Sequence, residues 1–355
     1  MKYSYPDNIR LSVEPQEFNR NSSKEILQYA VGGLLYMPAT KNIADVILNK
    51  THPEYKSICL DLEDAIGDDT VTQAEECLKS NLTRIRDAVN KNIISINDVP
   101  LIFIRVRTPD HFKHIIDLCG TDLFSVITGF NFPKFDKTNC DAYIRTFMNM
   151  QSKCKTELYF MPIIESKNVM YSQRRMDQLL YLQNKLSEVS DHVLNIRVGA
   201  TDFCNLFGIR RSIRDSIYDQ KVIADCFADV INIFARNYVC SGPVWEYFDS
   251  NGTPGLWSEG LKNELRLDKL NGFFGKTCIH PQQLPIIAES NIVSYENYQD
   301  AINILGMSDG LIGVQKGYKD NKMNEVKTHT NWAKKIVGRA VIYGVFEEEK
   351  ETSAI

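Results

Sequence analysis

Short apolar runs recur along the chain, and each is followed by a longer stretch with helical periodicity. The runs cover residues 33–37, 57–62, 101–106, 125–131, 158–164, 195–198, 238–240 and 274–279. Several of them are continuously apolar rather than alternating, which is typical of parallel strands that are covered on both faces. Between them, positions such as Ile223, Phe227 and Val230 form an apolar stripe at helical spacing. The pattern predicts a repeated strand–helix unit.

The number of these units favours a closed barrel. Eight strand–helix units within about 250 residues is the count of a TIM (β/α)₈ barrel. An open, doubly wound sheet is the alternative, but no glycine-rich phosphate loop follows the first predicted strand. We therefore expect an N-terminal extension over residues 1–30, a barrel over residues 31–290 and a C-terminal helical segment over residues 291–355.

Composition narrows the class of protein. Of 355 residues, 43% are hydrophobic and 24% are charged, which is typical of soluble globular proteins. The formal net charge of −4 argues against nucleic acid as a partner, because proteins that bind it are usually basic. No apolar run approaches the roughly 18 residues needed to cross a bilayer, and the first residues lack the apolar core of a signal peptide. We expect a cytoplasmic enzyme without a membrane partner.

The nine cysteines fit the same expectation. Their number is odd, their spacing is irregular and no Cys-x-x-Cys occurs, so neither a disulfide framework nor a zinc knuckle is indicated. Most of them lie in apolar stretches, where a reduced thiol behaves as a small hydrophobic group.

Charged residues gather where the predicted strands end. In a TIM barrel the carboxyl ends of the strands form the active-site face, so these side chains are expected to meet at one opening. Alternation along a strand places Asp61 and Glu63 on one side, and likewise Arg105 and Arg107. The charges singled out at these ends are Asp61, Glu63, Arg105, Arg107, Lys134, Glu165 and Asp202.

Carboxylates gathered in a partly dry site repel one another unless a cation lies among them. Oxygen ligands without a His or Cys cluster favour a hard ion, Mg²⁺ first and Mn²⁺ second. The alternative is that the acids form structural ion pairs with the Arg and Lys residues of the barrel. The pair His111 and His114, with Asp117 one turn later, is a further possible metal set, although a solvated helix start explains it better.

Five stretches of the chain resemble the HpcH/HpaI aldolase/citrate lyase family, especially members like the citrate lyase beta subunit. They are residues 34–39 (LLYMPA), 60–65 (LDLEDA), 105–107 (RVR), 161–166 (MPIIES) and 272–281 (GFFGKTCIHP). Each stretch alone is a weak signal. Together they follow the order of the family, and each lies at a predicted strand.

The resemblance implies a TIM barrel that cleaves or forms carbon–carbon bonds with Mg²⁺. By the resemblance, the metal ligands fall on Glu165 and Asp202, and Arg105 contacts the oxygens of the substrate. Breaking a carbon–carbon bond beside a carbonyl leaves an enolate, whose charge a metal ion and a guanidinium stabilise. Asp61 and Glu63 are expected to hydrogen-bond metal-bound water around this site.

Three features depart from the family pattern. Arg107 replaces an asparagine and would add positive charge to the pocket. The cluster Arg210, Arg211 and Arg214 could hold a phosphate or a second carboxylate, although a solvated helix start is the more usual explanation. Near the C-terminus, Glu325 stands close to the position of a family aspartate, so that acid is either shifted or lost.

Lys134 and His280 leave alternatives open. Lys134 is a candidate ligand for the far carboxylate of the substrate, and the alternative is an ion pair with Asp136 at the rim. His280 follows the last predicted strand, where it is either a proton carrier or a hydrogen-bonded structural residue.

The leading hypothesis is a Mg²⁺-dependent lyase or aldolase that acts on a small oxo- or hydroxy-acid, or on its CoA thioester, through a metal-stabilised enolate. One alternative is a barrel subunit that binds metal and ligand without catalysis. Another is a phosphoenolpyruvate-type enzyme on the same fold, with phosphate at the arginine cluster. The resemblance also implies a homo-oligomer, a trimer or a hexamer.

Overall fold

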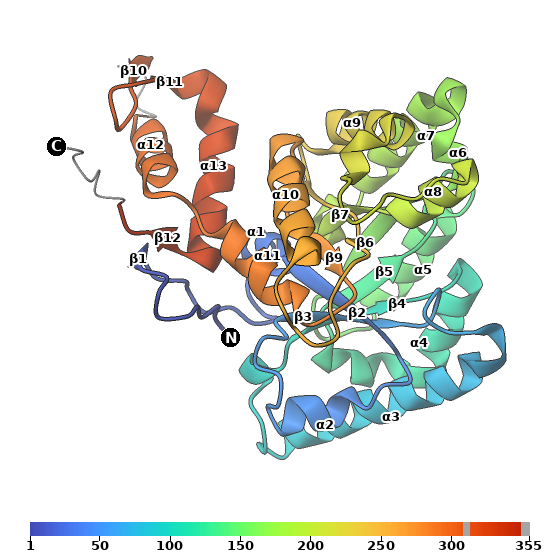
Figure 1. Cartoon of the computed structure of the whole chain (residues 1–355). Coiled ribbons are helices and arrows are strands. Elements are labelled where there is room, and N and C mark those ends of the chain that lie inside the picture. Colours follow the sequence, from blue (N-terminus) through green and yellow to red (C-terminus); the bar gives the residue numbers. More distant parts are fainter. Residues whose placement is uncertain (308–312, 349–355) are drawn as a thin grey trace. The chain divides into compact units, whose positions relative to one another are not determined.

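The chain forms two compact units in a computed structural model that describes residues 1–307 and 313–348 (Figure 1). The first unit contains Met1 and residues 19–287. The second combines residues 2–18 with the chain from residue 288 onward.

The first unit is built on eight parallel strands. They lie in the order β8-β7-β6-β5-β4-β3-β2-β9, so each strand neighbours its successor in the chain except where β9 returns to β2. A parallel bridge between Gly242 and Lys276 links the two outer strands and nearly closes the sheet. The predicted TIM (β/α)₈ barrel is thereby confirmed. The strands are β2 Gly33–Pro38, β3 Ser57–Asp61, β4 Leu101–Arg105, β5 Gly129–Phe132, β6 Tyr159–Ile164, β7 Asn195–Val198, β8 Val239–Ser241 and β9 Lys276–Cys278.

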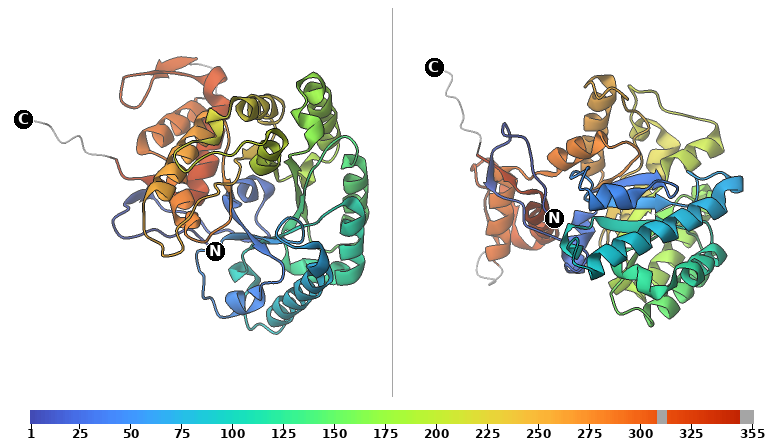
Figure 2. Two further views of the ribbon diagram at one scale, coloured as in Figure 1. Left: turned by 45° about the vertical axis from the view of Figure 1, so that its right-hand side comes forward. Right: turned by 90° about the horizontal axis from the view of Figure 1, so that it is seen from below.

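Helices surround the outside of these strands, as Figure 2 shows. Apolar side chains on the outer face of the barrel pack against them; Phe112 of α4, for example, lies 4.8 Å from the ring of Phe130 and 5.0 Å from that of Phe132. The helices are α1 Lys24–Ala30, α2 Ile43–Leu48, α3 Val71–Asn90, α4 Pro109–Leu123, α5 Cys140–Gln151, α6 Lys167–Met170, α7 Ser172–Ser187, α8 Ala200–Phe207, α9 Lys221–Phe234 and α10 Leu256–Leu270, followed by α11 Gln283–Asn291.

Most strand boundaries shift from the prediction by one or two residues, and the largest difference lies before β5. The run over residues 125–131 was expected to be a strand throughout, but residues 124–126 form a 3₁₀ turn and β5 begins only at Gly129. A Cβ atom at Gly129 would lie 1.9 Å from the carbonyl oxygen of Tyr159, so the close approach of β6 requires glycine there. The apolar run therefore contains both a turn and a strand.

A buried ion cluster holds α10 to the strand that closes the barrel. The Lys276 ammonium on β9 lies 2.9 Å from Glu264 and 2.8 Å from Asp268, both of which project from α10. Tyr218 donates a hydrogen bond of 2.7 Å to Asp268, and Arg211 lies 3.4 Å from Glu264. Glu264 and Lys276 are wholly buried. Each charge in this cluster thus depends on its partners for the solvation that it has lost.

The second unit has its own small core. Strand β1 Leu11–Val13 pairs antiparallel with β12 Val345–Phe346, so the two ends of the described chain share one short sheet. Helices α12 Tyr295–Gly306 and α13 Val326–Tyr343 pack through residues such as Ala301, Ile304 and Ala333. A hairpin joins β10 Val314–Lys316 to β11 Met323–Glu325. The domain boundaries drawn from the sequence at residues 30 and 290 stay predictions.

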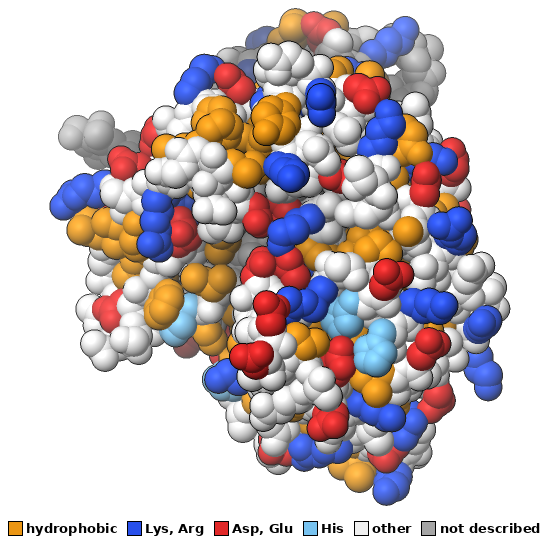
Figure 3. Space-filling model, turned by 90° about the vertical axis from the view of Figure 1, so that its right-hand side faces the viewer, with side chains coloured by type: hydrophobic (Ala, Val, Ile, Leu, Met, Phe, Trp, Pro, Cys, Tyr) orange, Lys and Arg blue, Asp and Glu red, His pale blue; other side chains and the backbone are white. Residues whose placement is uncertain are grey.

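The nine cysteines are all free, and most are buried, as expected for reduced core thiols. Among residues 1–307 and 313–348, no helix has the length and apolar character needed to span a membrane. Acidic and basic side chains are interspersed over the face drawn in Figure 3.

The ion cluster generates a stability prediction. Lys276→Met should lower the free energy of unfolding by about 3–5 kcal/mol, because two buried carboxylates lose their cation. Urea unfolding measures the change, with Lys262→Met on the exposed face of α10 as the matched control. A loss below about 1 kcal/mol would show that the cluster contributes little to closing the barrel.

Candidate active site

A cavity of about 400 Å³ opens at the carboxyl ends of the barrel strands. This is the end at which TIM barrels carry their active sites. All of the residues that line it belong to the first unit, and they come from β2, β3, β4, β6, β7 and β9 and from the segments that follow β3, β6, β7, β8 and β9. The polar members of the lining are Tyr36, Asp61, Asp64, Arg105, Glu165, Thr201, Asp202, Glu246 and Thr277.

Arg105 is fixed in the cavity by Asp61. The two residues are paired in register on the neighbouring strands β4 and β3, and the guanidinium binds both carboxylate oxygens, Nε to Oδ1 at 2.7 Å and Nη2 to Oδ2 at 2.6 Å. Both side chains are buried. Because β3 ends at Asp61, the same carboxylate also accepts hydrogen bonds from the backbone N–H groups of Glu63 and Ala65. Asp61 therefore orients both the guanidinium and the turn after β3.

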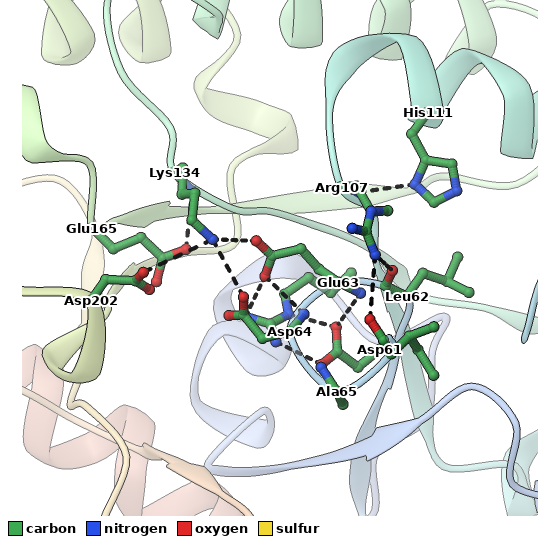
Figure 4. A network of polar contacts seen from close by, with 12 residues as sticks. Asp61, Leu62, Glu63, Asp64, Ala65, Arg107, His111, Lys134, Glu165 and Asp202 are labelled. Carbon is green, nitrogen blue, oxygen red and sulfur yellow. Dashed lines mark hydrogen bonds and ion pairs between the residues drawn. The ribbon is translucent and has the colours of Figure 1, made fainter. Parts of the chain in front are cut away.

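Lys134 gathers three acids from two segments around its ammonium group, as Figure 4 shows. It binds Glu63 in a short ion pair, lies 3.5 Å from Asp64 and lies 4.0 Å from Asp202. Glu63 and Asp64 each also lie 3.1 Å from Arg105. Burial nevertheless raises the pKa of Glu63 to about 7. The alternative pairing of Lys134 with Asp136 is wrong, since Asp136 instead accepts hydrogen bonds from Thr138 and Asn168.

The backbone of Lys134 adopts an unusual conformation. Its φ is +48°, in the left-handed region that residues other than Gly, Asn and Asp rarely adopt. In this conformation its N–H donates a 3.0 Å hydrogen bond to Glu165 Oε1, while the ammonium reaches Glu63. Strain of this kind persists where the surroundings fix it, and it is common at functional sites.

Glu165 and Asp202 face the same part of the cavity. Glu165 follows the last residue of β6, and Asp202 lies in the first turn of α8. Glu165 is 5% exposed, and its only hydrogen bond within the described chain is the one from Lys134. Burial and the charge of Asp202 raise the pKa of Glu165 to about 8. Gly199 makes room for this carboxylate, because a Cβ atom there would lie 2.0 Å from Oε2.

These two carboxylates fit a hard divalent cation. Both are oxygen donors, and burial together with the charge of Asp202 disfavours the ionised form of Glu165 when no cation lies between them. No cluster of three or more potential metal-ligating side chains occurs among the residues that the structure describes. Mg²⁺ is commonly held by one or two carboxylates, with water and substrate oxygens completing its six ligands. The donor set therefore suits Mg²⁺ better than a metal that needs a full protein cage.

The structure does not bring every predicted residue to the cavity. Arg107 lies beyond the end of β4 and turns away to bind Asp68. Arg211 is buried against Glu264 and donates to the Val244 carbonyl, and neither Arg107 nor Arg211 belongs to the cavity lining. Arg210 is exposed and lies 3.2 Å from Glu246, which does line the cavity.

The other sequence candidates lie elsewhere. Glu325 ends β11 in the second unit, directly before α13, and accepts a hydrogen bond from Thr328. His111 and His114 lie within hydrogen-bond distance, 2.9 and 3.2 Å, of the two carboxylate oxygens of Glu75 on the outside of the barrel. His280 stacks on Phe248 with ring centroids 4.4 Å apart.

Sequence reasoning missed several cavity residues. Asp64 was overlooked because alternation was extended past Asp61, where the strand ends. Tyr36 and Thr277 lie inside stretches that carried the family resemblance, but as uncharged residues they gave no signal of chemistry. Arg197 did give a signal, because a charged residue within the buried strand β7 breaks its apolar pattern.

Comparison with known proteins assigns the family. A family model described as C–C bond lyase of the TIM-barrel fold matches residues 25–345, which is most of the chain. The chain belongs to this family of carbon–carbon bond lyases. The sequence-based resemblance to the HpcH/HpaI aldolase/citrate lyase family and the prediction of a carbon–carbon lyase are thereby confirmed. A search among curated protein sequences gave no match.

One solved structure shares the fold of this lyase, and others are more distantly similar. Protein CitE from Mycobacterium tuberculosis, in complex with magnesium, acetoacetate and coenzyme A, is 18% identical with a TM-score of 0.55, over 88% of this chain and 99% of that chain. The citrate lyase beta subunit from the same organism, complexed with oxaloacetate and magnesium, is 16% identical with a TM-score of 0.48, over 74% and 98%. RipC from Yersinia pestis is 17% identical with a TM-score of 0.49, over 74% and 95%.

The raised pKa of Glu165 predicts how the stability of the metal-free lyase depends on pH. Between pH 4.5, the usual pKa of a glutamate, and about pH 8, Glu165 is deprotonated in the unfolded chain but stays protonated in the folded protein. The free energy of unfolding of the wild type therefore falls as pH rises through this range. Glu165→Gln removes this loss and keeps the acceptor for the Lys134 N–H. In a chelator, the variant should therefore gain on the order of 2 kcal/mol over wild type between pH 5 and pH 8.5.

Urea unfolding at the two pH values measures this gain, and Glu76→Gln on the exposed face of α3 is the control. An equal difference at both pH values would mean that Glu165 ionises normally.

Proposed function

We propose that this member of the family is a Mg²⁺-dependent lyase that cleaves or forms a carbon–carbon bond in a small oxo- or hydroxy-acid. The observation that carries the proposal is the meeting of Glu165, Asp202 and the fixed guanidinium of Arg105 in one cavity at the carboxyl ends of the barrel strands. The CitE relative was solved with magnesium, acetoacetate and coenzyme A, which supports the same class of ligands here, the CoA thioester included.

Glu165 and Asp202 are the residues that would hold the metal. When bound, Mg²⁺ supplies a Lewis acid for the carbonyl oxygen beside the bond that breaks. The backbone N–H of Lys134 fixes the orientation of Glu165, and Gly199 leaves the space that its carboxylate needs.

Arg105 would stabilise the negative charge that develops on the substrate oxygen. Its guanidinium is held by both oxygens of Asp61, so it does not have to reorganise as the charge forms. The cavity walls near it include Ile163, Val198 and Ile279, and apolar walls strengthen such interactions by excluding water. Asp61 thus acts as a positioning residue for Arg105.

Lys134 would balance the acids that do not contact the substrate. Its ammonium binds Glu63 and approaches Asp64 and Asp202, and the hydrogen bond to Glu63 outweighs burial and keeps the pKa of Lys134 above its usual value. The lysine therefore stays charged at neutral pH. By pairing with Glu63 and Asp64, it keeps these two carboxylates from competing for the metal ion, so that Glu165 and Asp202 remain to bind it.

The phosphoenolpyruvate alternative has less support. It required a phosphate site at the arginine cluster, but Arg211 is buried in an ion pair with Glu264 and Arg210 lies against Glu246. The cytoplasmic location and the assembly into a trimer or hexamer stay predictions.

The metal site is tested with Glu165→Gln and Asp202→Asn. Each should weaken Mg²⁺ binding, measured by calorimetry, by at least about 10- to 100-fold, because changing even the residues that support metal ligands has an effect of this size. Turnover of candidate oxo- and hydroxy-acids should be lost in parallel, while Glu76→Gln behaves as wild type. Wild-type Mg²⁺ affinity in both variants would move the metal site elsewhere.

The role of Arg105 is tested with Arg105→Lys. Lysine keeps the charge but cannot bind both Asp61 oxygens, so kcat should fall by about 10²- to 10³-fold with little change in Mg²⁺ affinity. Steady-state kinetics and calorimetry on the same preparation separate the two effects. An unchanged kcat would remove Arg105 from the chemistry.

A further inference from the structure

Two hydroxyl groups in the cavity have a hydrogen to donate and no acceptor. Thr277 Oγ1 on β9 accepts a 2.8 Å hydrogen bond from Arg197 Nη2, and the Tyr36 hydroxyl on β2 accepts one of 2.6 Å from Asn131 Nδ2. Among the described residues neither hydroxyl donates to a protein group. Both residues line the cavity. Because each oxygen already accepts a hydrogen bond, its own O–H is available to a ligand there.

Arg197 lies directly behind Thr277 and carries an unbalanced charge. Its side chain projects from β7 and is 1% exposed, and its Nε and Nη1 atoms have no hydrogen-bond partner. Within the described chain no acid lies at ion-pair distance from it, and Thr277 is its one hydrogen-bond acceptor. A buried cation in this state is unfavourable unless an anion comes close. Arg197 therefore marks a position beneath the cavity where negative charge is favoured.

The positive charge is concentrated around Tyr36. The guanidinium carbon of Arg197 lies 5.9 Å from the centroid of the Tyr36 ring, and that of Arg105 lies 5.1 Å from it. Asp61 balances Arg105, whereas Arg197 has no such partner. In the strand order, β2 and β6 are four strands apart in a barrel of eight, so Tyr36 lies across the barrel from Glu165. The cavity thus has hydroxyl donors on β2 and β9 beside the buried guanidinium that projects from β7, with Tyr36 across the barrel from Glu165.

We propose that Tyr36 and Thr277 form a carboxylate-binding subsite, positioned and polarised by Arg197. The proposal rests on the proposed function and extends it to the class of substrate. One end of the acid lies toward Glu165 and Asp202, and the hydroxyls of Tyr36 and Thr277 donate to a second carboxylate at the other end. These two hydroxyls thereby select acids that carry a second carboxylate, and Arg197 acts through Thr277 as a positioning residue.

The hydroxyl donors explain how one cavity holds an anion so close to several acids. A carboxylate at Tyr36 and Thr277 receives charge-assisted hydrogen bonds and lies near an unpaired guanidinium. The carboxylates of Glu63, Asp64 and Asp202 lie beside the Lys134 ammonium, which compensates their charge. The acids of the cavity and a bound carboxylate thereby have separate cationic partners.

The test compares two stable hydroxy-acids that differ by one carboxylate, malate and lactate, by calorimetry in the presence of Mg²⁺. Wild type should bind malate at least tenfold more tightly than lactate. In Thr277→Val, Tyr36→Phe and Arg197→Met, this preference should fall below threefold through weaker malate binding, while lactate affinity changes less than threefold. Thr128→Val, which removes a buried, unpartnered hydroxyl outside the cavity lining, should keep the preference.

Thermal unfolding gives a second readout for Arg197. Replacing an unpaired buried cation with methionine should raise the melting temperature of the ligand-free protein while malate affinity falls, a combination that a purely structural arginine would not give. A lower melting temperature with equal losses for both acids would overturn the subsite.

The remaining outcomes separate this inference from the proposed function. Equal binding of malate and lactate by wild type, abolished for both in Glu165→Gln, would contradict the subsite and leave the lyase proposal standing. Failure of wild type to bind either acid would contradict the subsite, and turnover of other acids would then decide the lyase proposal.

Discussion

The balance of charge at one end of the barrel is the constraint on which the site depends. Parallel strands deliver their carboxyl ends to the same face, so Asp61, Glu63 and Glu165 meet although they are far apart in the chain. Arg105 and Lys134 compensate most of this charge. The left-handed backbone of Lys134 follows from that task, since it directs the N–H and the ammonium of one residue to different acids.

The incomplete compensation is as informative as the ion pairs. A fully paired cluster, such as Lys276 with Glu264 and Asp268, stabilises the fold and leaves nothing for a ligand. In the cavity, by contrast, burial and the charge of Asp202 keep the pKa of Glu165 raised, and Arg197 on the neighbouring strand β7 keeps unpartnered nitrogen atoms. A bound cation and a bound anion would satisfy these two groups, which is the charge pattern of a metal-bound dicarboxylic acid.

The sequence predicted the barrel because buried parallel strands are continuously apolar, and it predicted the main site because strand ends share one face. It could not predict where each strand stops. The alternation of side chains between the two faces of the sheet holds as far as Asp61 and Arg105, where the strands end. Beyond these residues it fails, so Arg107 was wrongly expected beside Arg105, and Asp64 was overlooked. Partners distant in the chain were equally hidden, as in Lys134 with Glu63 and Arg211 with Glu264.

Crystals soaked in Mn²⁺ and examined by anomalous diffraction test the central claim most directly. The account predicts one strong anomalous peak between the carboxylates of Glu165 and Asp202, at about the 2.0–2.2 Å from an oxygen of each that small hard cations adopt. It also predicts that the peak disappears in Glu165→Gln. A peak elsewhere in the barrel, or none at a concentration that supports turnover, would contradict it.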